Sequence, residues 1–349
     1  MSPRSQLEVA YRVARERYGG DAGVCGIDIG FLPDKGGGPR VGVRVHRLDG
    51  SFRVPPGRAS LRAGKAIPFA FRARYGASGC YATDGDQRGA RVSVLQPGIC
   101  VGRRGTPEAT GTLGAIVYDR SGRPGILSNW HVLAGNAQAK DKDAIVQPGE
   151  LCQDPNSRVV ARLDLGRSFR GVAGDAAVAF LEKGLHWKRE PLGSSVLLAG
   201  VRRARLGDEL EKSGSKTAIT RGRVDGVGRY FIVLESERVA IDGFRLVPRD
   251  EGEVIAYGGD SGSLWYDPTT SLGVGLHFGR DASGTGAVLA CHLPTVLSKL
   301  RVSLTPPVSR RGARRSRRWG FKAPGVQGAG SRIVRRGNNG ARVRGDHHS

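Results

Sequence analysis

The stretch "EVIAYGGDSGSLWYD", Glu253 to Asp267, places a serine between two glycines and directly after an aspartate. A serine hydroxyl is a weak nucleophile at neutral pH unless a histidine takes its proton, a carboxylate orients that histidine and N–H groups bind the oxyanion. Because the chain has 54 glycines among 349 residues, "GDSGS" can also be interpreted as a polar turn. The choice depends on whether Ser261 has suitable partners elsewhere in the chain.

Two residues upstream of Ser261 have the surroundings that such partners need. His131 lies in "GILSNWHVLAG", where an apolar run ends in a polar turn, and Asp175 opens "GDAAVAFLE", ahead of an apolar β run. The separations are 44 and 86 residues in the order His, Asp, Ser. Asp164 in "ARLDLG" is an alternative carboxylate, but it is followed by a single apolar residue before Gly166. Each residue alone has a structural interpretation, whereas the three together predict an activated serine.

These three contexts resemble the chymotrypsin-fold serine peptidases. In that family the histidine follows a "TNxHV"-like strand end, matched by "LSNWHVL"; the aspartate opens a "D-[IA]-A-[LV]-[AL]" strand, matched by "DAAVA"; and the serine stands in "GDSGG", matched by "GDSGS". The runs "TGTLGAIVYD", "KSGSKTAITRGRV" and "LGVGLHFG" further resemble the bacterial and plant group related to the plant Narrow Leaf protein. The resemblance covers roughly residues 91–304.

The resemblance implies a role for each matched residue. Ser261 would attack the scissile carbonyl, His131 would act as general base and then as acid, and Asp175 would fix the imidazole tautomer. The N–H groups of Gly259 and Ser261 would form the oxyanion hole, and glycine at 259 suits a backbone conformation that most side chains resist. No cofactor and no metal are expected, and the partner would be a protein or peptide substrate.

The sequence departs from the family pattern at several positions. No "IVGG"-like start precedes "TGTLGAIVYD", so the released N-terminus that pairs with the aspartate before the serine in zymogen activation is missing. Asp260 must therefore find another partner. Val132 replaces the cysteine that follows the histidine in secreted animal members, and Ser263 replaces the second glycine.

Two positions bear on the substrate pocket. Ile255 lies six residues before Ser261, where enzymes that cut after basic residues have an aspartate, so a preference for Arg or Lys is not supported. His277 in "GLHFG" resembles the histidine with which staphylococcal glutamyl endopeptidases recognise an acidic side chain. Its alternative interpretation is a polar residue on a strand of the pocket wall.

The fold expected from these patterns is mainly β, a chymotrypsin-like double β-barrel. Short β runs separated by turns fill residues 91–304, with the boundary between two barrels near 195–205. Residues 1–90 are predicted to form an α/β module, with an amphipathic first helix and a hairpin in "VCGIDIGFLPDKGGGPRVGVRVHR". Residues 305–349 are predicted to be a disordered, Arg-rich tail.

Charge suggests a second class of function. The formal net charge is +23, and the residues from Arg301 onward contain 13 arginines and lysines against the single acid Asp346. Such a tail could bind nucleic acid through phosphates, although a compositional preference for arginine explains it equally well. A peptide-binding pseudoenzyme and assembly into an oligomer are further alternatives.

The remaining composition suggests a cytoplasmic protein. Five cysteines are an odd number without a CxxC pair, so they are expected to be reduced. No run of about 18 apolar residues predicts a membrane span, and the first residues lack the apolar segment of a secretory signal. His46, His186 and His292 have no metal-ligand spacing and are expected to be structural.

Overall fold

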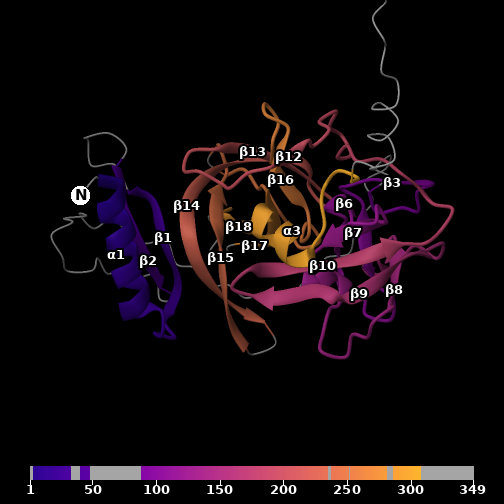
Figure 1. Ribbon diagram of the computed structural model, residues 1–349, viewed down its shortest axis with the longest axis horizontal. Coiled ribbons are helices and arrows are strands. Elements are labelled where there is room, and N and C mark those ends of the chain that lie inside the picture. Colours follow the sequence, from indigo (N-terminus) through magenta and orange to yellow (C-terminus); the bar gives the residue numbers. More distant parts are fainter. Residues whose placement is uncertain are drawn as a thin grey trace, which may run out of the picture. The chain divides into compact units, whose positions relative to one another are not determined.

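The computed structural model describes residues 3–32, 40–47, 88–234, 237–250, 252–280 and 286–307. Two large β-sheets make up most of this part of the chain, which confirms the expected mainly β fold of the chymotrypsin-like, two-barrel type (Figure 1). Most of the predicted tail, residues 308–349, lies outside the described residues, as do residues 48–87 of the predicted first module.

The first sheet, which forms the first barrel, has seven strands and encloses one hydrophobic core. Its interior residues include Val101, Leu113, Ile126 and Val160, each fully buried. In spatial order the strands are β5 (Thr110–Thr112), β4 (Cys100–Arg103), β8 (Ala144–Gln147), β9 (Arg158–Gly171), β10 (Gly174–Leu181), β7 (Pro124–Ser128) and β6 (Ala115–Tyr118).

The second sheet contains a closed antiparallel barrel. Its strands follow the order β13 (Glu209–Gly214), β16 (Leu264–Asp267), β17 (Leu272–Arg280), β18 (Val288–His292), β15 (Glu237–Val247) and β14 (Ala218–Leu234). The ring closes because β13 pairs with β14 as well as with β16. A barrel closed in this way leaves no unpaired edge along these strands.

Shorter elements complete the described chain. These are the helices α2 (Trp130–Leu133) and α3 (Leu293–Leu300), the 3₁₀ turn η1 (Glu150–Cys152), the parallel pair β3 (Val94–Leu95) and β11 (His186–Trp187), and β12 (Gly200–Val201), which pairs with β17. Within the described ranges, no helix has the length and apolar character needed to cross a membrane.

The N-terminal residues join the second sheet. Strands β1 (Val24–Leu32) and β2 (Arg40–Arg47) form the expected antiparallel hairpin, and β1 pairs with residues 226–230 of β14. Helix α1 (Pro3–Tyr18) covers this hairpin with its apolar side, where Ala14 and Tyr18 are buried (Figure 1). The hairpin thus continues the sheet of the second barrel.

Strand β10 matters most for the position of the site, because it is buried on both faces. Ala177 and Ala179 face the first barrel's core, whereas Val178 and Phe180 face a core shared with strands and α3 of the second barrel. Side chains alternate across a strand, so β10 belongs to both cores at once. Asp175, near its start, is therefore held at the junction of the two barrels.

Candidate active site

His131 lies on the short helix that follows β7. The strand ends at Ser128, and Asn129 precedes α2 in an extended conformation. The side-chain amide of Asn129 donates to the main-chain oxygen of Asp175 at 2.7 Å, which ties the start of α2 to β10. His131 is thereby held against the strand that carries the candidate aspartate.

The structure brings His131 and Asp175 into direct contact. Nδ1 of His131 lies 2.5 Å from Oδ2 of Asp175, and the main-chain N–H of His131 donates to Oδ1 at 3.2 Å. Asp175 is fully buried and His131 nearly so. Because a carboxylate only accepts, the imidazole carries its proton on Nδ1, and Nε2 of the neutral ring is left as an acceptor.

The rival carboxylate, Asp164, has a different environment. It forms an ion pair with Arg167 at 2.6 Å on β9. Asp175, and not Asp164, is the carboxylate at His131, in agreement with the weight given to the apolar strand that follows it.

Ser261 lies in the loop between β15 and β16, and its backbone is fixed from both barrels. Its main-chain oxygen accepts from the N–H of Thr112 on β5 at 2.7 Å, and the next N–H, of Gly262, donates to the oxygen of His277 at 2.9 Å. Gly262 has φ +90°, and a Cβ there would lie 2.0 Å from Oγ of Ser128. Only glycine allows the serine loop to approach the strand that leads to His131 this closely.

Gly259 has the backbone conformation that the sequence suggested. Its φ is +105°, in the region that favours glycine. Its carbonyl oxygen accepts from the hydroxyls of Thr112 and Ser215, both at 2.8 Å. The role of its N–H as an oxyanion donor stays a prediction.

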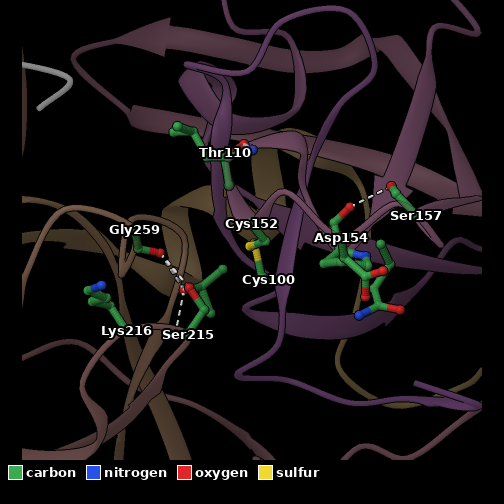
Figure 2. The surroundings of a disulfide bond; sticks show 12 residues. Cys100, Thr110, Cys152, Asp154, Ser157, Ser215, Lys216 and Gly259 are labelled. Atoms are coloured by element: carbon green, nitrogen blue, oxygen red, sulfur yellow. Dashed lines mark hydrogen bonds between the residues drawn. A yellow bond between two sulfur atoms is a disulfide. The ribbon is translucent and has the colours of Figure 1, made fainter. Parts of the chain in front are cut away.

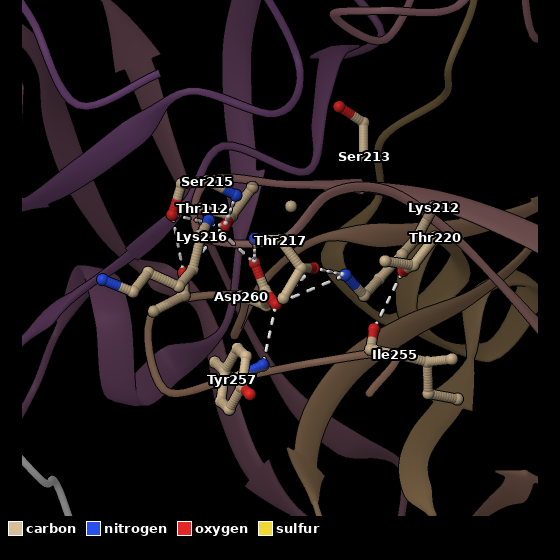
Figure 3. A network of polar contacts seen from close by, with 12 residues as sticks. Thr112, Lys212, Ser213, Ser215, Lys216, Thr217, Thr220, Ile255, Tyr257 and Asp260 are labelled. Atoms are coloured by element: carbon tan, nitrogen blue, oxygen red, sulfur yellow. Dashed lines mark hydrogen bonds and ion pairs between the residues drawn. The ribbon is translucent and has the colours of Figure 1, made fainter. Parts of the chain in front are cut away.

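Asp260, which the sequence left without a partner, is paired with Lys212. Both side chains are fully buried, and Nζ of Lys212 lies 3.4 Å from Oδ2 of Asp260 (Figure 3). The carboxylate also accepts from the N–H groups of Lys216, Thr217 and Tyr257 and from the Thr217 hydroxyl.

The net effect of these contacts is a lowered pKa for Asp260. Burial alone would raise the pKa of its carboxyl group, but the Lys212 cation and the hydrogen-bond donors outweigh it. An ionised Asp260 thus holds both ends of the Tyr257–Ser261 turn to β13 and to the loop that follows it.

The candidate pocket residues are both buried. Ile255 belongs to the second barrel's core, and its main-chain oxygen accepts from the Thr220 hydroxyl at 2.8 Å. His277 on β17 is 2% exposed, its ring lies edge-on to Trp265, and its Nδ1 has no hydrogen-bond partner among the described residues. Burial and the Lys212 cation lower the pKa of His277 to about 3, so its imidazole is neutral near pH 7. Whether substrate touches either residue stays a prediction.

The expectation that all cysteines are reduced is wrong for one pair. Cys100 on β4 and Cys152 at the end of η1 form a disulfide, 52 residues apart in sequence (Figure 2). Cysteine spacing could not reveal it, because the pairing depends on how β4 and η1 meet in space. Cys25 and Cys291 are buried, and Cys80 lies outside the described residues. No group of metal-binding side chains occurs in the described ranges.

Three polar residues of the site were not identified from sequence: Thr112, Lys212 and Ser215. All are buried, and they come from "TGTLG" and "KSGSKT", runs that contributed only to the family resemblance. A lysine flanked by Glu211 and Ser213 has no sequence signal of burial. The partnerless Asp260 was the one available indication that a buried cation had to exist.

Removal of the Lys212 cation tests how much this ion pair stabilises the fold. We expect Lys212→Met to lower the free energy of unfolding by about 3–5 kcal/mol, because the buried Asp260 carboxylate loses its counter-ion. Denaturant-induced unfolding at neutral pH measures the change. The matched control is Lys216→Met, since the ammonium of Lys216 points away from Asp260 in Figure 3 and its main-chain bond survives.

The control should change the unfolding free energy by no more than about 0.5 kcal/mol. The double variant Lys212→Met/Asp260→Asn, which buries no unpaired charge, should be more stable than Lys212→Met alone. Equal stability of the Lys212→Met and Lys216→Met variants would contradict the assignment.

Comparison with known proteins gives a likeness of fold. No family model matches the chain, and no curated protein matches its sequence. Among solved structures, a glutamic acid-specific serine protease that uses a histidine triad in substrate binding has 17% identity and a TM-score of 0.47, over 60% of this chain and 100% of its own. Thermobifida fusca protease A has 16% identity and a TM-score of 0.45, over 61% and 100%.

The chymotrypsin of Cellulomonas bogoriensis has 16% identity and a TM-score of 0.44, over 61% of this chain and 99% of its own. Identities this low concern the fold and assign no residue a role. These three solved structures are proteases with a chymotrypsin-like fold.

Proposed function

We propose that this chain is a serine endopeptidase that cleaves peptide bonds through Ser261, His131 and Asp175. The observation that carries the proposal is the contact of His131 Nδ1 with a fully buried Asp175 carboxylate. This contact gives the imidazole the tautomer that can accept a proton at Nε2. The serine loop is packed against the end of β7, the strand that leads into the helix of His131.

In the proposed reaction, the Ser261 hydroxyl adds to the scissile carbonyl while its proton passes to His131. The N–H groups of Gly259 and Ser261 stabilise the oxyanion, and the amine leaves with the proton from His131, which yields an acyl-enzyme. Water, activated by the same imidazole, then hydrolyses the ester and restores Ser261. Asp175 stabilises the imidazolium in both halves.

Two exposed apolar residues lie close in sequence to the proposed site residues. Val172 and Tyr257 are each 47% exposed, and they lie three residues before Asp175 and two before Gly259. Large apolar side chains at the surface commonly mark binding sites when they gather at a functional locus. We assign them to contacts with substrate side chains.

Within the proposed site, His277 recognises the side chain that precedes the scissile bond, and that side chain is acidic. A buried imidazole nitrogen without a partner costs about 1–3 kcal/mol, which a ligand carboxylate can recover by accepting from its N–H. Ile255 supplies no carboxylate for a basic side chain, because it is apolar and buried in the barrel core.

Covalent labelling tests the nucleophile. A fluorophosphonate probe should label the wild-type protein, and Ser261→Ala should abolish labelling, because the probe phosphonylates only an activated serine. The matched control is Ser263→Ala, a buried serine two residues away, which should label like the wild type. A folded wild type that is not labelled would favour a peptide-binding pseudoenzyme.

A second test concerns the carboxylate. Asp175→Asn should lower kcat by about 10⁴-fold, since an amide at this position favours the wrong imidazole tautomer. Asp164→Asn is the control, because Asp164 pairs with Arg167 on β9 and should leave kcat unchanged. Ester or peptide hydrolysis measures both, and an equal loss in the two variants would reject the assigned role of Asp175.

Peptides that differ only in the residue before the scissile bond test His277. Glu should give a higher kcat/KM than Gln, and His277→Ser should lower the Glu-to-Gln ratio about tenfold, the loss expected for one charge-assisted hydrogen bond. His292→Ser, a buried histidine on the neighbouring β18, is the control and should keep the ratio.

The pH dependence of the Glu-to-Gln ratio of kcat/KM shows whether His277 binds the acidic side chain as a neutral imidazole or as a cation. Because the pKa of His277 is lowered to about 3, its charge does not change between about pH 6 and pH 8, and the ratio should stay constant. A ratio that falls as the pH rises through this range would show that the imidazole titrates there.

A further inference from the structure

Thr112 on β5 contacts the serine loop, the end of β7 and the loop of Ser215. Its main-chain N–H donates to the oxygen of Ser261 at 2.7 Å, and its main-chain oxygen accepts from the Ser128 hydroxyl at 2.7 Å. Ser128 ends β7, the strand that leads into the helix of His131. Thr112 itself is fully buried.

The hydroxyl of Thr112 completes a small network around the carbonyl of Gly259. Oγ1 of Thr112 donates to this oxygen at 2.8 Å and accepts from the N–H of Ser215 at 2.9 Å. The Ser215 hydroxyl donates to the same oxygen, also at 2.8 Å. Figure 3 shows Thr112 and Ser215 side by side next to the Asp260 turn.

This network restrains the backbone of Gly259, which has no side chain to limit its conformation. Glycine has no Cβ, so it adopts left-handed and right-handed conformations at similar cost, and its φ of +105° needs support from outside. Two donors on one carbonyl fix the plane of the peptide bond that follows Gly259. A turn of the Gly259 carbonyl would break both hydrogen bonds, and the Gly259 N–H, which belongs to the peptide bond before it, is thereby restrained from one side.

The fold of β5 gives no reason for a hydroxyl at position 112. Valine has the same shape as threonine and an equal or greater preference for strands, so it would serve a buried strand position equally well. The hydrogen bonds of the hydroxyl go to Gly259 in the serine loop and to Ser215. The hydroxyl is therefore explained by the loops that it joins and not by its own strand.

We propose that Thr112 is a positioning residue, whose hydroxyl holds Gly259 so that its N–H faces the developing oxyanion. The inference rests on the proposed peptidase function and adds to it a residue of the first barrel that acts through the loop of the second. Thr112 does not touch the reacting atoms. Its effect reaches them through the backbone of Gly259, whose N–H belongs to the peptide bond before the restrained carbonyl.

Removal of the hydroxyl alone tests the inference. Thr112→Val should lower the second-order rate of fluorophosphonate labelling by about 10- to 100-fold, somewhat less than the loss of a whole oxyanion donor. For hydrolysis of p-nitrophenyl acetate, kcat should fall and KM should stay, because the lost contact matters only in the transition state. Thr112→Ser, which keeps the hydroxyl, should recover most of the rate.

The matched control is Thr110→Val on the same strand. The Thr110 hydroxyl donates to the oxygen of Pro107 and accepts from the N–H of Leu151. Within the part of the chain that the structure describes it has no hydrogen bond to the serine loop, so this variant should label at the wild-type rate. The pH at which labelling is half-maximal should be the same in the wild type and in Thr112→Val, since His131 and Asp175 are untouched. A role in folding alone would lower the melting temperature and leave the rate per folded molecule unchanged.

The outcomes separate this inference from the proposed function. A folded wild type that is not labelled overturns the function itself. A labelled wild type together with Thr112→Val at the wild-type rate overturns only the role of Thr112. If Thr112→Val does not fold, Ser215→Ala removes the second donor to Gly259 and leaves β5 intact; an unchanged rate in that variant overturns the inference, and a loss of tenfold or more supports it.

Discussion

The buried ion pair between Lys212 and Asp260 is the interaction on which the arrangement of the site depends. Asp260 lies between Gly259 and Ser261, so whatever fixes its carboxylate also fixes the backbone of both neighbours. Two fully buried charges are tolerated only when they neutralise each other and fill their remaining hydrogen bonds, as they do here with Thr217, Tyr257 and Lys216. Because Lys212 is part of β13, formation of the second barrel places the counter-ion beside Asp260.

The two barrels contribute different halves of the proposed chemistry, and a few residues join them. β10 lies in both cores and presents Asp175 to His131, while the serine loop comes from the second barrel. Thr112 bridges the halves with its N–H, its carbonyl and its hydroxyl. The relative position of His131 and Ser261 therefore depends on packing between the barrels and on hydrogen bonds such as those of Thr112, and no single element holds the three proposed catalytic residues.

The sequence was sufficient to predict the site where a residue lies in a motif that resembles those of the family. The contexts of His131 and Asp175 predicted a contact that the structure contains, and the glycines beside Ser261 predicted a left-handed backbone at Gly259. Lys212 and the Cys100–Cys152 bond escaped because no motif in the sequence marks them, and each pairing is decided by how separate segments pack in space. A lysine next to acidic and polar residues resembles a surface lysine until β13 is placed against the serine loop.

The N-terminal hairpin shows the same dependence on distant pairing. Strand β14 uses one edge twice: residues 218–223 pair with β13, and residues 226–230 pair with β1. The hairpin is fastened there by Asp28, which accepts from Arg44 at 2.7 Å and from the Tyr230 hydroxyl at 2.9 Å in a fully buried position. Arg44 and His46 lower the pKa of Asp28 although burial alone would raise it. Strand β14 therefore pairs both with β13, which contains Lys212, and with β1, which contains Asp28. This pairing joins the N-terminal hairpin to the sheet that supplies the counter-ion of Asp260.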